Sequence, residues 1–253
     1  MEIITLTKEN LSSEHICCAI SDNNDIQVAS KKAWLSQRFD DGLVFKKGAV
    51  RGKCFIEYQP GEKAWYPIDA ADYMHINCFW VSGQHQGQGY ANLLLQQCIQ
   101  DSKTQNKKGL SIISAKKKKP FLCDPDYLKY QGFKLADSCE PFYELLYLNF
   151  TTSTAKPLFK EHLKTKSSKL EPGFVLYYSD QCPFTAKYVP LIVEVAQAQA
   201  ISLQVVHLTS LQAAQKAPTP STSYSLFYNG EFYTNEILSV KKFTTIIESL
   251  AAK

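Results

Sequence analysis

A polar loop with two glycines stands between an apolar stretch and an amphipathic helix. The loop runs from Gln84 to Gly89, and apolar residues recur at i, i+3, i+4 and i+7 from Ala91 onward. Gly87 and Gly89 leave the backbone uncovered, so its N–H groups can approach a ligand closely. The helix amino terminus adds free donors and a positive dipole end, which together suit a pyrophosphate. The spacing matches neither the dinucleotide fingerprint nor a Walker loop.

Two titratable side chains on predicted strands are candidates for a general base. Glu57 is flanked by Ile56 and Tyr58, an apolar setting that can raise the pKa of a carboxyl group. His75 titrates near neutral pH without help. Either could take a proton through a water molecule. The alternatives are a surface glutamate on an edge strand and a core histidine with satisfied hydrogen bonds.

A third candidate is Cys182, in the segment Asp180-Gln-Cys-Pro-Phe-Thr185. It precedes a predicted helix that continues through Ala200, and a helix amino terminus is expected to lower the pKa of a thiol. Cys182 is then a monothiol redox switch, a binding site for a thiol compound, or a scaffold cysteine. Pro190 lies inside the same helix, where a proline costs about 3 kcal/mol unless a kink is wanted.

The composition describes a mildly basic globular chain. The 253 residues are 45% hydrophobic with a net charge of +4, enough for one core or two small ones and no sign of nucleic-acid binding. No apolar run could span a membrane, and the amino terminus lacks the features of a signal peptide, so we expect a cytoplasmic protein. The eight scattered cysteines are expected to be reduced thiols, and their spacing predicts no metal site.

Alternating and helical patterns predict the elements of the first 150 residues. A strand over 2–7 precedes a short helix that begins at Leu11 and a second helix over 25–39. Segments 43–47 and 50–58 form a hairpin, and 69–81 is a long strand with residues 73, 75, 77 and 79 on one face. After the loop and its helix come a buried strand over 110–114, a short helix over 126–130 capped by Gly132, and two closing strands.

The remaining residues divide into a polar segment and a second alternating region. Residues 151–172 are rich in Thr, Ser and Lys and predict a linker, with about two helical turns starting at Pro157. From Gly173 onward, strands over 174–179, 203–208 and up to Gly230 alternate with helices, the last from Val240.

The order of elements over residues 1–150, together with Gln84–Gly89 and Gln131-Gly132-Phe133, resembles the GNAT N-acetyltransferases. The resemblance implies an α/β (α+β) fold with a mixed, mostly antiparallel sheet, flanking helices and acetyl-CoA as acyl donor. It also implies that the loop backbone holds the pyrophosphate and that the strand edge over 79–81 pairs with the pantetheine amides. The implied cofactor-binding residues are Phe79, Trp80, Val81, Gln84, His85, Gln86, Gly87, Gln88, Gly89 and Tyr90.

The family often has a tyrosine four residues before the late glycine, where it protonates the departing CoA thiolate. Leu128 occupies that position here, and Tyr127 and Tyr130 on either side of it are the candidates for the role.

The segment from Gly173 resembles the thioredoxin fold, with Cys182 as the first active-site cysteine. Thr185 replaces the second cysteine of C-x-x-C and Thr222 stands at the usual cis-proline position, so dithiol chemistry is not expected. A GNAT domain followed by such a domain resembles the YoaP-type proteins. The expected division is a GNAT domain (1–150), a linker (151–172) and a small thioredoxin-like domain (173–253).

The resemblance implies an N-acetyltransferase that transfers acetyl from acetyl-CoA to a primary amine of a small molecule or peptide, without a metal, nucleic acid or membrane partner. Glu57, His75, Tyr127 and Tyr130 are its candidate catalytic residues. Two alternatives remain, namely a non-catalytic acyl-CoA sensor and a monothiol protein acting through Cys182.

Overall fold

The computed structural model describes residues 1–253 apart from 20–21, 23, 152–154, 166–171 and 252–253. Its larger sheet has seven strands in the order β1-β2-β3-β5-β6-β8-β7. Strands β5 and β6 run parallel and the other neighbours antiparallel. The strands are β1 (Ile3–Thr5), β2 (Val44–Gly48), β3 (Cys54–Pro60), β5 (Tyr73–Val81), β6 (Gly109–Ala115), β7 (Lys134–Cys139) and β8 (Tyr143–Asn149).

Helices cover both faces of this sheet. On one face, α2 (Tyr90–Thr104) and α3 (Pro125–Tyr130) pack on a core that includes Ile56, Ile76 and Leu146. On the other, α1 (Ile26–Arg38) covers the β1–β3 half. The sheet is thus mixed and mostly antiparallel with flanking helices, which confirms the predicted fold class.

The second sheet belongs to the carboxyl-terminal part of the chain. Its order is β11-β10-β12-β13, with β10 and β11 parallel and the rest antiparallel. Its core includes Leu176, Ile192 and Phe243. The elements are β10 (Phe174–Tyr178), α4 (Pro183–Ala198), β11 (Leu203–His207), α5 (Leu211–Gln215), β12 (Tyr224–Tyr228), β13 (Glu231–Thr234) and α6 (Val240–Ala251).

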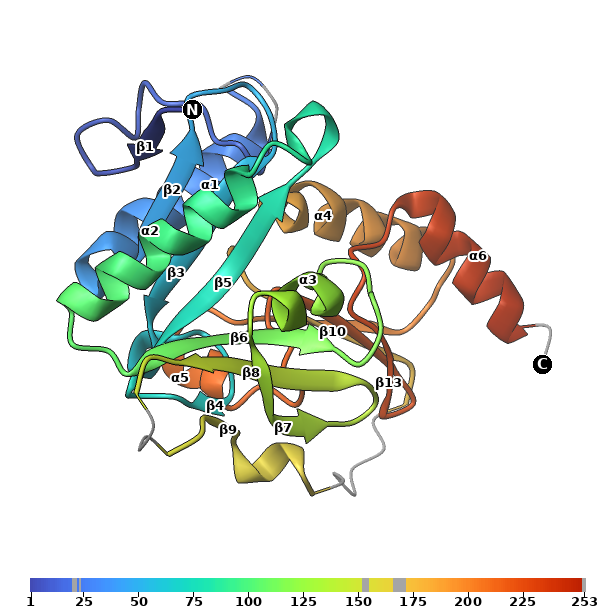
Figure 1. Ribbon diagram of the computed structural model, residues 1–253. Helices are drawn as coiled ribbons and strands as arrows, with labels where there is room; N and C mark the ends of the chain where they lie inside the picture. Colours follow the sequence, from blue (N-terminus) through green and yellow to red (C-terminus); the bar gives the residue numbers. More distant parts are fainter. Residues whose placement is uncertain (20–21, 23, 152–154, 166–171, 252–253) are drawn as a thin grey trace.

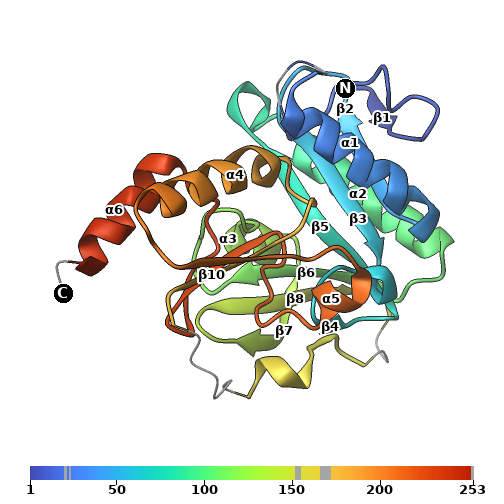
Figure 2. The ribbon, with the colours of Figure 1, turned by 180° about the vertical axis from the view of Figure 1, so that it is seen from behind.

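The carboxyl-terminal part lies on the same face of the large sheet as α1, beside the β5–β8 half (Figure 2). Ala214 of α5 joins the core under α1, and Phe232 of β13 packs edge-on against Tyr143 of β8 with ring centroids 5.9 Å apart. Asn235 Nδ2 donates to the carbonyl oxygen of Pro120 at 2.9 Å. These contacts connect the carboxyl-terminal part to the elements that flank the β5–β6 pair on either side.

Two predicted helices are absent from the described residues. Residues 8–14 form turns, because the Asn10 side chain accepts from Thr7 N and donates to Thr5 O and so competes with a helix. After Pro157 the chain forms the strand β9 (Leu158–Phe159), paired with β4 (Ile68–Asp69), and a 3₁₀ turn, η4 (Glu161–Leu163). Three further 3₁₀ turns are η1 (Phe39–Asp41), η2 (Gly61–Lys63) and η3 (Gly83–His85).

Strand β5 does not keep the predicted alternation along its whole length. Opposite β3, Tyr58 pairs with Ile76 but Glu57 pairs with Cys78, so one residue of β5 bulges out between them. Beyond the bulge, Phe79 packs in the core under α2 together with Ile76. The prediction that residues 73, 75, 77 and 79 share one face is therefore wrong for Phe79.

Candidate functional site

A cavity of about 970 Å³ opens where β5 and β6 separate. The two strands pair only from Tyr73 with Gly109 to Ile76 with Ile112, and they diverge beyond that point (Figure 1). The cavity lies between the diverging parts of the two strands. It extends from the start of α2 to the start of α4 and the segment before β12. Its lining therefore comes from segments that are far apart in the sequence.

One end of the cavity is built by the glycine loop. Gly87 and Gly89 adopt φ values of +73° and +77°, and a Cβ atom at either would meet nothing within 4 Å. Gly89 is the N-cap of α2, and no side chain among the described residues caps that terminus. Donor groups and the positive dipole end of α2 therefore face this part of the cavity. The predicted loop residues that line it are His85, Gln86, Gly87, Gly89 and Tyr90.

Two predicted loop residues do not line the cavity. Gln84 and Gln88 are exposed and contact each other, with Gln88 Nε2 donating to the carbonyl oxygen of Gln84. His85 is 9% exposed and its ring lies against Gly52, where a Cβ atom would come within 2.5 Å of Nε2. Gly52 thus makes room for the His85 ring, a contact that the loop pattern did not indicate.

The edge of β5 that faces the cavity carries Phe79, Trp80 and Val81. The carbonyl oxygen of Phe79 accepts from Cys123 Sγ at 3.6 Å, and that of Val81 accepts from Gln86 Nε2 at 3.2 Å. The Cys123 thiol is a weak donor and the Gln86 side chain is exposed. An extended ligand could therefore replace both as hydrogen-bond partners of this edge.

Tyr127 of α3 lies beside this edge. Its ring packs edge-on against Phe79 with centroids 5.7 Å apart, and its hydroxyl donates to Asn92 Oδ1 at 3.2 Å. Burial raises the pKa of Tyr127 to about 12, so the hydroxyl carries its proton at neutral pH. Tyr130, the other predicted tyrosine, is 85% exposed and does not line the cavity.

The other end of the cavity contains a buried ion pair. Glu57 is 1% exposed, and its Oε2 lies 2.5 Å from Nζ of Lys31, which is 2% exposed. Asn77 Nδ2 donates to Glu57 Oε1 at 3.2 Å. Burial opposes the charge on Lys31, but the facing carboxylate of Glu57 outweighs it and raises the pKa of the amine. Lys31 therefore keeps its positive charge although it is buried.

Lys31 also joins the two sheets. Its Nζ donates to the carbonyl oxygen of Gln181 at 2.6 Å, from the segment that precedes α4. Glu57, predicted as a base, thus lines the cavity next to a lysine from α1 and a carbonyl from the second part of the chain. Sequence patterns missed Lys31, because a lysine on the helix 25–39 gives no local sign of a distant partner.

His75 lies away from the cavity, in the part of β5 that pairs on both sides. It is fully buried, with Nδ1 3.0 Å from Ser111 Oγ and its ring 4.8 Å from that of Tyr66. Burial lowers its pKa to about 3. His75 is therefore neutral at physiological pH, as in the alternative interpretation of a core histidine.

Cys182 lines the cavity at the end near Glu57, together with Cys18, Cys78 and Cys123. All eight cysteines are free thiols. Burial raises the pKa of Cys182 to about 11, although the residue is the N-cap of α4. The predicted lowering of its pKa is therefore wrong, since loss of hydration outweighs the helix terminus.

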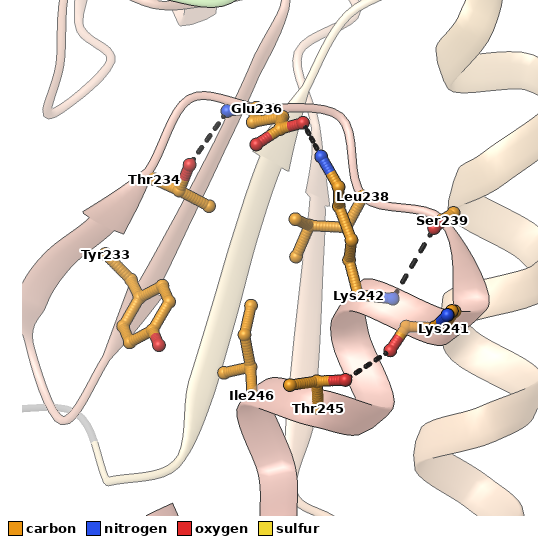
Figure 3. Close-up of a pocket in the computed structure, with 9 residues that line it drawn as sticks. All are labelled: Tyr233, Thr234, Glu236, Leu238, Ser239, Lys241, Lys242, Thr245 and Ile246. Atoms are coloured by element: carbon orange, nitrogen blue, oxygen red, sulfur yellow. Dashed lines mark hydrogen bonds and ion pairs between the residues drawn. The ribbon is translucent and has the colours of Figure 1, made fainter. Parts of the chain in front are cut away.

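A second hollow, of about 580 Å³, lies between β13 and the start of α6 (Figure 3). Its polar groups bond to one another: Lys242 Nζ pairs with Glu236, and Thr245 Oγ1 donates to the carbonyl oxygen of Lys241. None of the predicted site residues lines it. It holds no group of candidate catalytic residues, so the cavity at the β5–β6 opening is the candidate site.

Comparisons with known proteins find two family models and several solved structures that resemble parts of this chain. Residues 66–134, which include the glycine loop and the diverging part of β5, match the acetyltransferase (GNAT) domain, and residues 202–244 match the YoaP-like family. Among solved structures, a ribosomal-protein-alanine N-acetyltransferase from Brucella melitensis is 16% identical with a TM-score of 0.41, covering 58% of this chain and 97% of that one. A GNAT family acetyltransferase from the same organism, solved with acetyl-CoA, is 12% identical with a TM-score of 0.38, covering 61% and 91%.

A relative of similar length shows the family. The uncharacterized N-acetyltransferase YoaP of Bacillus subtilis (strain 168) is 39% identical over 249 residues, which are 98% of this chain and 99% of that protein. The chain therefore belongs to the YoaP family of GNAT N-acetyltransferases, which confirms the GNAT and YoaP-type resemblance. Among the described residues, no helix is long and apolar enough to cross a membrane, and no cluster of three His, Cys, Asp or Glu side chains could hold a metal ion.

Proposed function

We propose that this enzyme transfers the acetyl group of acetyl-CoA to a primary amine inside the cavity at the β5–β6 opening. The observation that carries the proposal is that one continuous cavity joins the glycine loop, Tyr127 and the buried carboxylate of Glu57. Anion-binding backbone, a proton donor and a proton acceptor thus stand along one path, in the order that the reaction needs.

The glycine-loop end takes the pyrophosphate of acetyl-CoA. The uncapped amino terminus of α2 supplies backbone N–H donors and a favourable dipole, and Gly87 and Gly89 let the phosphates come close. The pantetheine arm then extends along the open edge of β5, where its amides replace the Cys123 and Gln86 side chains as partners of Phe79 and Val81. This places the thioester near Tyr127.

The chemistry is direct attack of the amine nitrogen on the thioester carbonyl. A new N–C bond forms, the C–S bond breaks, and the nitrogen loses a proton that passes through a water molecule to the Glu57 carboxylate. The CoA thiolate leaves with the proton of the Tyr127 hydroxyl, which stays protonated at neutral pH because burial raises its pKa to about 12. Cys182 takes no part as a nucleophile, since burial raises its pKa to about 11 and keeps the thiol protonated.

We further propose the domain division of the chain into a GNAT domain (1–150), a linker (151–172) and a thioredoxin-like domain (173–253). The strand order β11-β10-β12-β13 and the parallel β10–β11 pair joined through α4 support the thioredoxin-like assignment. So does Cys182 at the amino terminus of α4.

Calorimetry with CoA and release of free thiol from acetyl-CoA test this function. We expect CoA to bind, and one or more amines to raise thiol release above the rate without amine. Tyr127→Phe should lower kcat by about 10²-fold or more, the usual contribution of a positioned acid. Tyr130→Phe is the matched control and should keep the parent rate, because that ring is exposed. A folded protein that binds no CoA would refute the proposal, and equal rates for the two tyrosine variants would remove Tyr127 from it.

A further inference from the structure

The end of the cavity opposite the glycine loop is walled by the carboxyl-terminal domain. Gln181, Cys182 and Phe184 line it from the start of α4, and Ser221 and Ser223 line it from the segment before β12. Lys31, Glu57 and Cys78 line the same end from the GNAT domain. We propose, on the basis of the function above, that this end is an acceptor chamber shared by both domains, and that its acceptor is a low-molecular-weight primary amine rather than a protein or peptide.

The wall is held in place by buried polar contacts between the domains. Lys31 Nζ binds the carbonyl oxygen of Gln181 at 2.6 Å, and Thr222 Oγ1 donates to the carbonyl oxygen of Trp65 at 2.6 Å. Thr222 is 0% exposed, and breaking such a contact leaves a buried group unpaired. The carboxyl-terminal domain is therefore a fixed part of the chamber.

Gln181 carries an unused acceptor at this wall. Its side chain is buried, with the residue 6% exposed, and Nε2 donates to Thr222 Oγ1 at 3.0 Å and to Ser179 Oγ at 3.1 Å. The Thr222 hydroxyl gives its proton to Trp65, so it must accept from Gln181, which fixes the nitrogen on that side. Gln181 Oε1 has no hydrogen-bond partner among the described residues. This oxygen is itself covered, so an amine N–H in the chamber satisfies it after a small shift of the Gln181 side chain towards the chamber.

Size and charge define the substrate class. A cavity of about 970 Å³ has the volume of a site for one drug-sized ligand, and it must hold the reactive arm of acetyl-CoA as well as the acceptor. The charges of Lys31 and Glu57 cancel within the chamber. A small, weakly basic amine fits this space, because it enters uncharged and donates its N–H to Gln181.

Gln181→Met tests the role of the amide with little change in shape. Thiol release from acetyl-CoA is measured with small, weakly basic primary amines such as aniline, aminoacetonitrile and trifluoroethylamine, with methylamine and phenethylamine as strongly basic comparisons, and with short peptides that offer an amino terminus or a lysine side chain. We expect turnover of a small amine and none of the peptides, a KM for that amine at least tenfold higher in Gln181→Met, and a Kd for CoA within twofold of the parent. Gln197→Met, at an exposed site on α4, is the matched control and should keep the parent KM.

Ser223→Leu is a second variant, which narrows the chamber from the other segment of the wall, and it should raise the same KM. An unchanged amine KM in both folded variants overturns the shared chamber. Peptide turnover at least as fast as that of any small amine does the same, and so does a lack of turnover of every small amine by a protein that binds acetyl-CoA. Because CoA binding is measured separately, these results are distinct from failure of the proposed acetyl-CoA site.

Discussion

The two halves of strand β5 differ in what surrounds them, and the difference separates structural from functional residues. From Tyr73 to Ile76 the strand pairs with β3 on one side and β6 on the other, and His75 is sealed in the core. From Asn77 to Val81 it keeps β3 but loses β6, and these residues line the cavity. A titratable side chain on this strand is available for chemistry only where the neighbouring strand has moved away.

The bulge between the halves brings the second half into position. One extra residue in β5 opposite Glu57 and Tyr58 turns Phe79 towards α2 and places Cys78 on the face of Phe55 and α1. Asn77 then reaches Glu57 with its side chain. The carboxylate on β3 is thereby held at the cavity by a residue of the strand beside it.

The largest expected effect comes from breaking the ion pair opposite the second half of β5. Lys31→Met leaves the Glu57 carboxylate buried without its counter-charge, which typically costs about 3–5 kcal/mol. We expect a correspondingly lower urea midpoint. Lys8→Met is the matched control, because the Lys8–Asp40 pair is as short, at 2.6 Å, but exposed, and such pairs contribute about 0–1 kcal/mol.

The double variant Lys31→Met/Glu57→Leu tests whether the stability is lost because a charge is left unpaired or because side-chain packing is lost. Replacing both members of a buried ion pair by apolar residues is often nearly neutral, so this variant should recover most of the lost stability. A Lys31→Met protein as stable as Lys8→Met would show that the carboxylate does not depend on Lys31.

Features that depend on neighbours in sequence were predictable, and those that depend on partners across the fold were not. The glycine loop, the helix after it and most strands of the large sheet follow from local patterns, so their positions agree with the structure. The predicted strand 69–81 is too long, because Asp69 belongs to β4, which pairs with β9, and β5 begins only at Tyr73. The bulge in β5 could not be predicted, because residues 78–81 are all apolar and the sequence there has no alternation that would show which residues share a face. The Lys31–Glu57 pair and the Gln181 contact join residues that are 26 and 150 positions apart.

Burial is the quantity that sequence patterns misjudged most. Cys182 does precede a helix, as predicted, but its pKa rises because burial of the thiol disfavours the charged thiolate. Tyr127 and Tyr130 are equivalent in the sequence, three residues apart on one short helix, yet only Tyr127 faces the cavity. Neither difference has a signal within a few residues of the position concerned.

The glycine loop that follows the second half of β5 gives a smaller, specific effect. Gly89→Val places a side chain where the proposed site holds the phosphates of CoA, and it should raise the Kd for CoA at least tenfold, or about 1.4 kcal/mol. Isothermal titration measures it. Gly83→Val is the matched control, since Gly83 also has a positive φ, +61°, with nothing within 4 Å of its Cβ position, but does not line the cavity. Equal Kd values for the two valine variants would make the loop a structural turn.

At neutral pH the smallest effect belongs to the paired half of β5, where His75 is buried in its neutral form. Its ring has Ser111 at Nδ1 but no partner at Nε2 among the described residues, so a second proton would be buried without an acceptor. The pKa of His75 is accordingly lowered from 6.5 to about 3 by burial. Well above pH 6.5 the ring is neutral in both the folded and the unfolded chain, so its titration does not affect the stability there.

As the pH falls below 6.5, the unfolded chain binds a proton at residue 75 that the folded chain refuses, so stability is lost towards pH 3. The contribution of one such group is at most about 1.4 kcal/mol per pH unit. Urea unfolding between pH 7 and pH 4 should therefore give a shallower decline for His75→Gln than for the parent. Titration of the His75 ring by NMR is the direct measurement. A ring that protonates near pH 6.5 in the folded protein would place His75 in reach of water, and the contrast between the two halves of β5 would no longer hold.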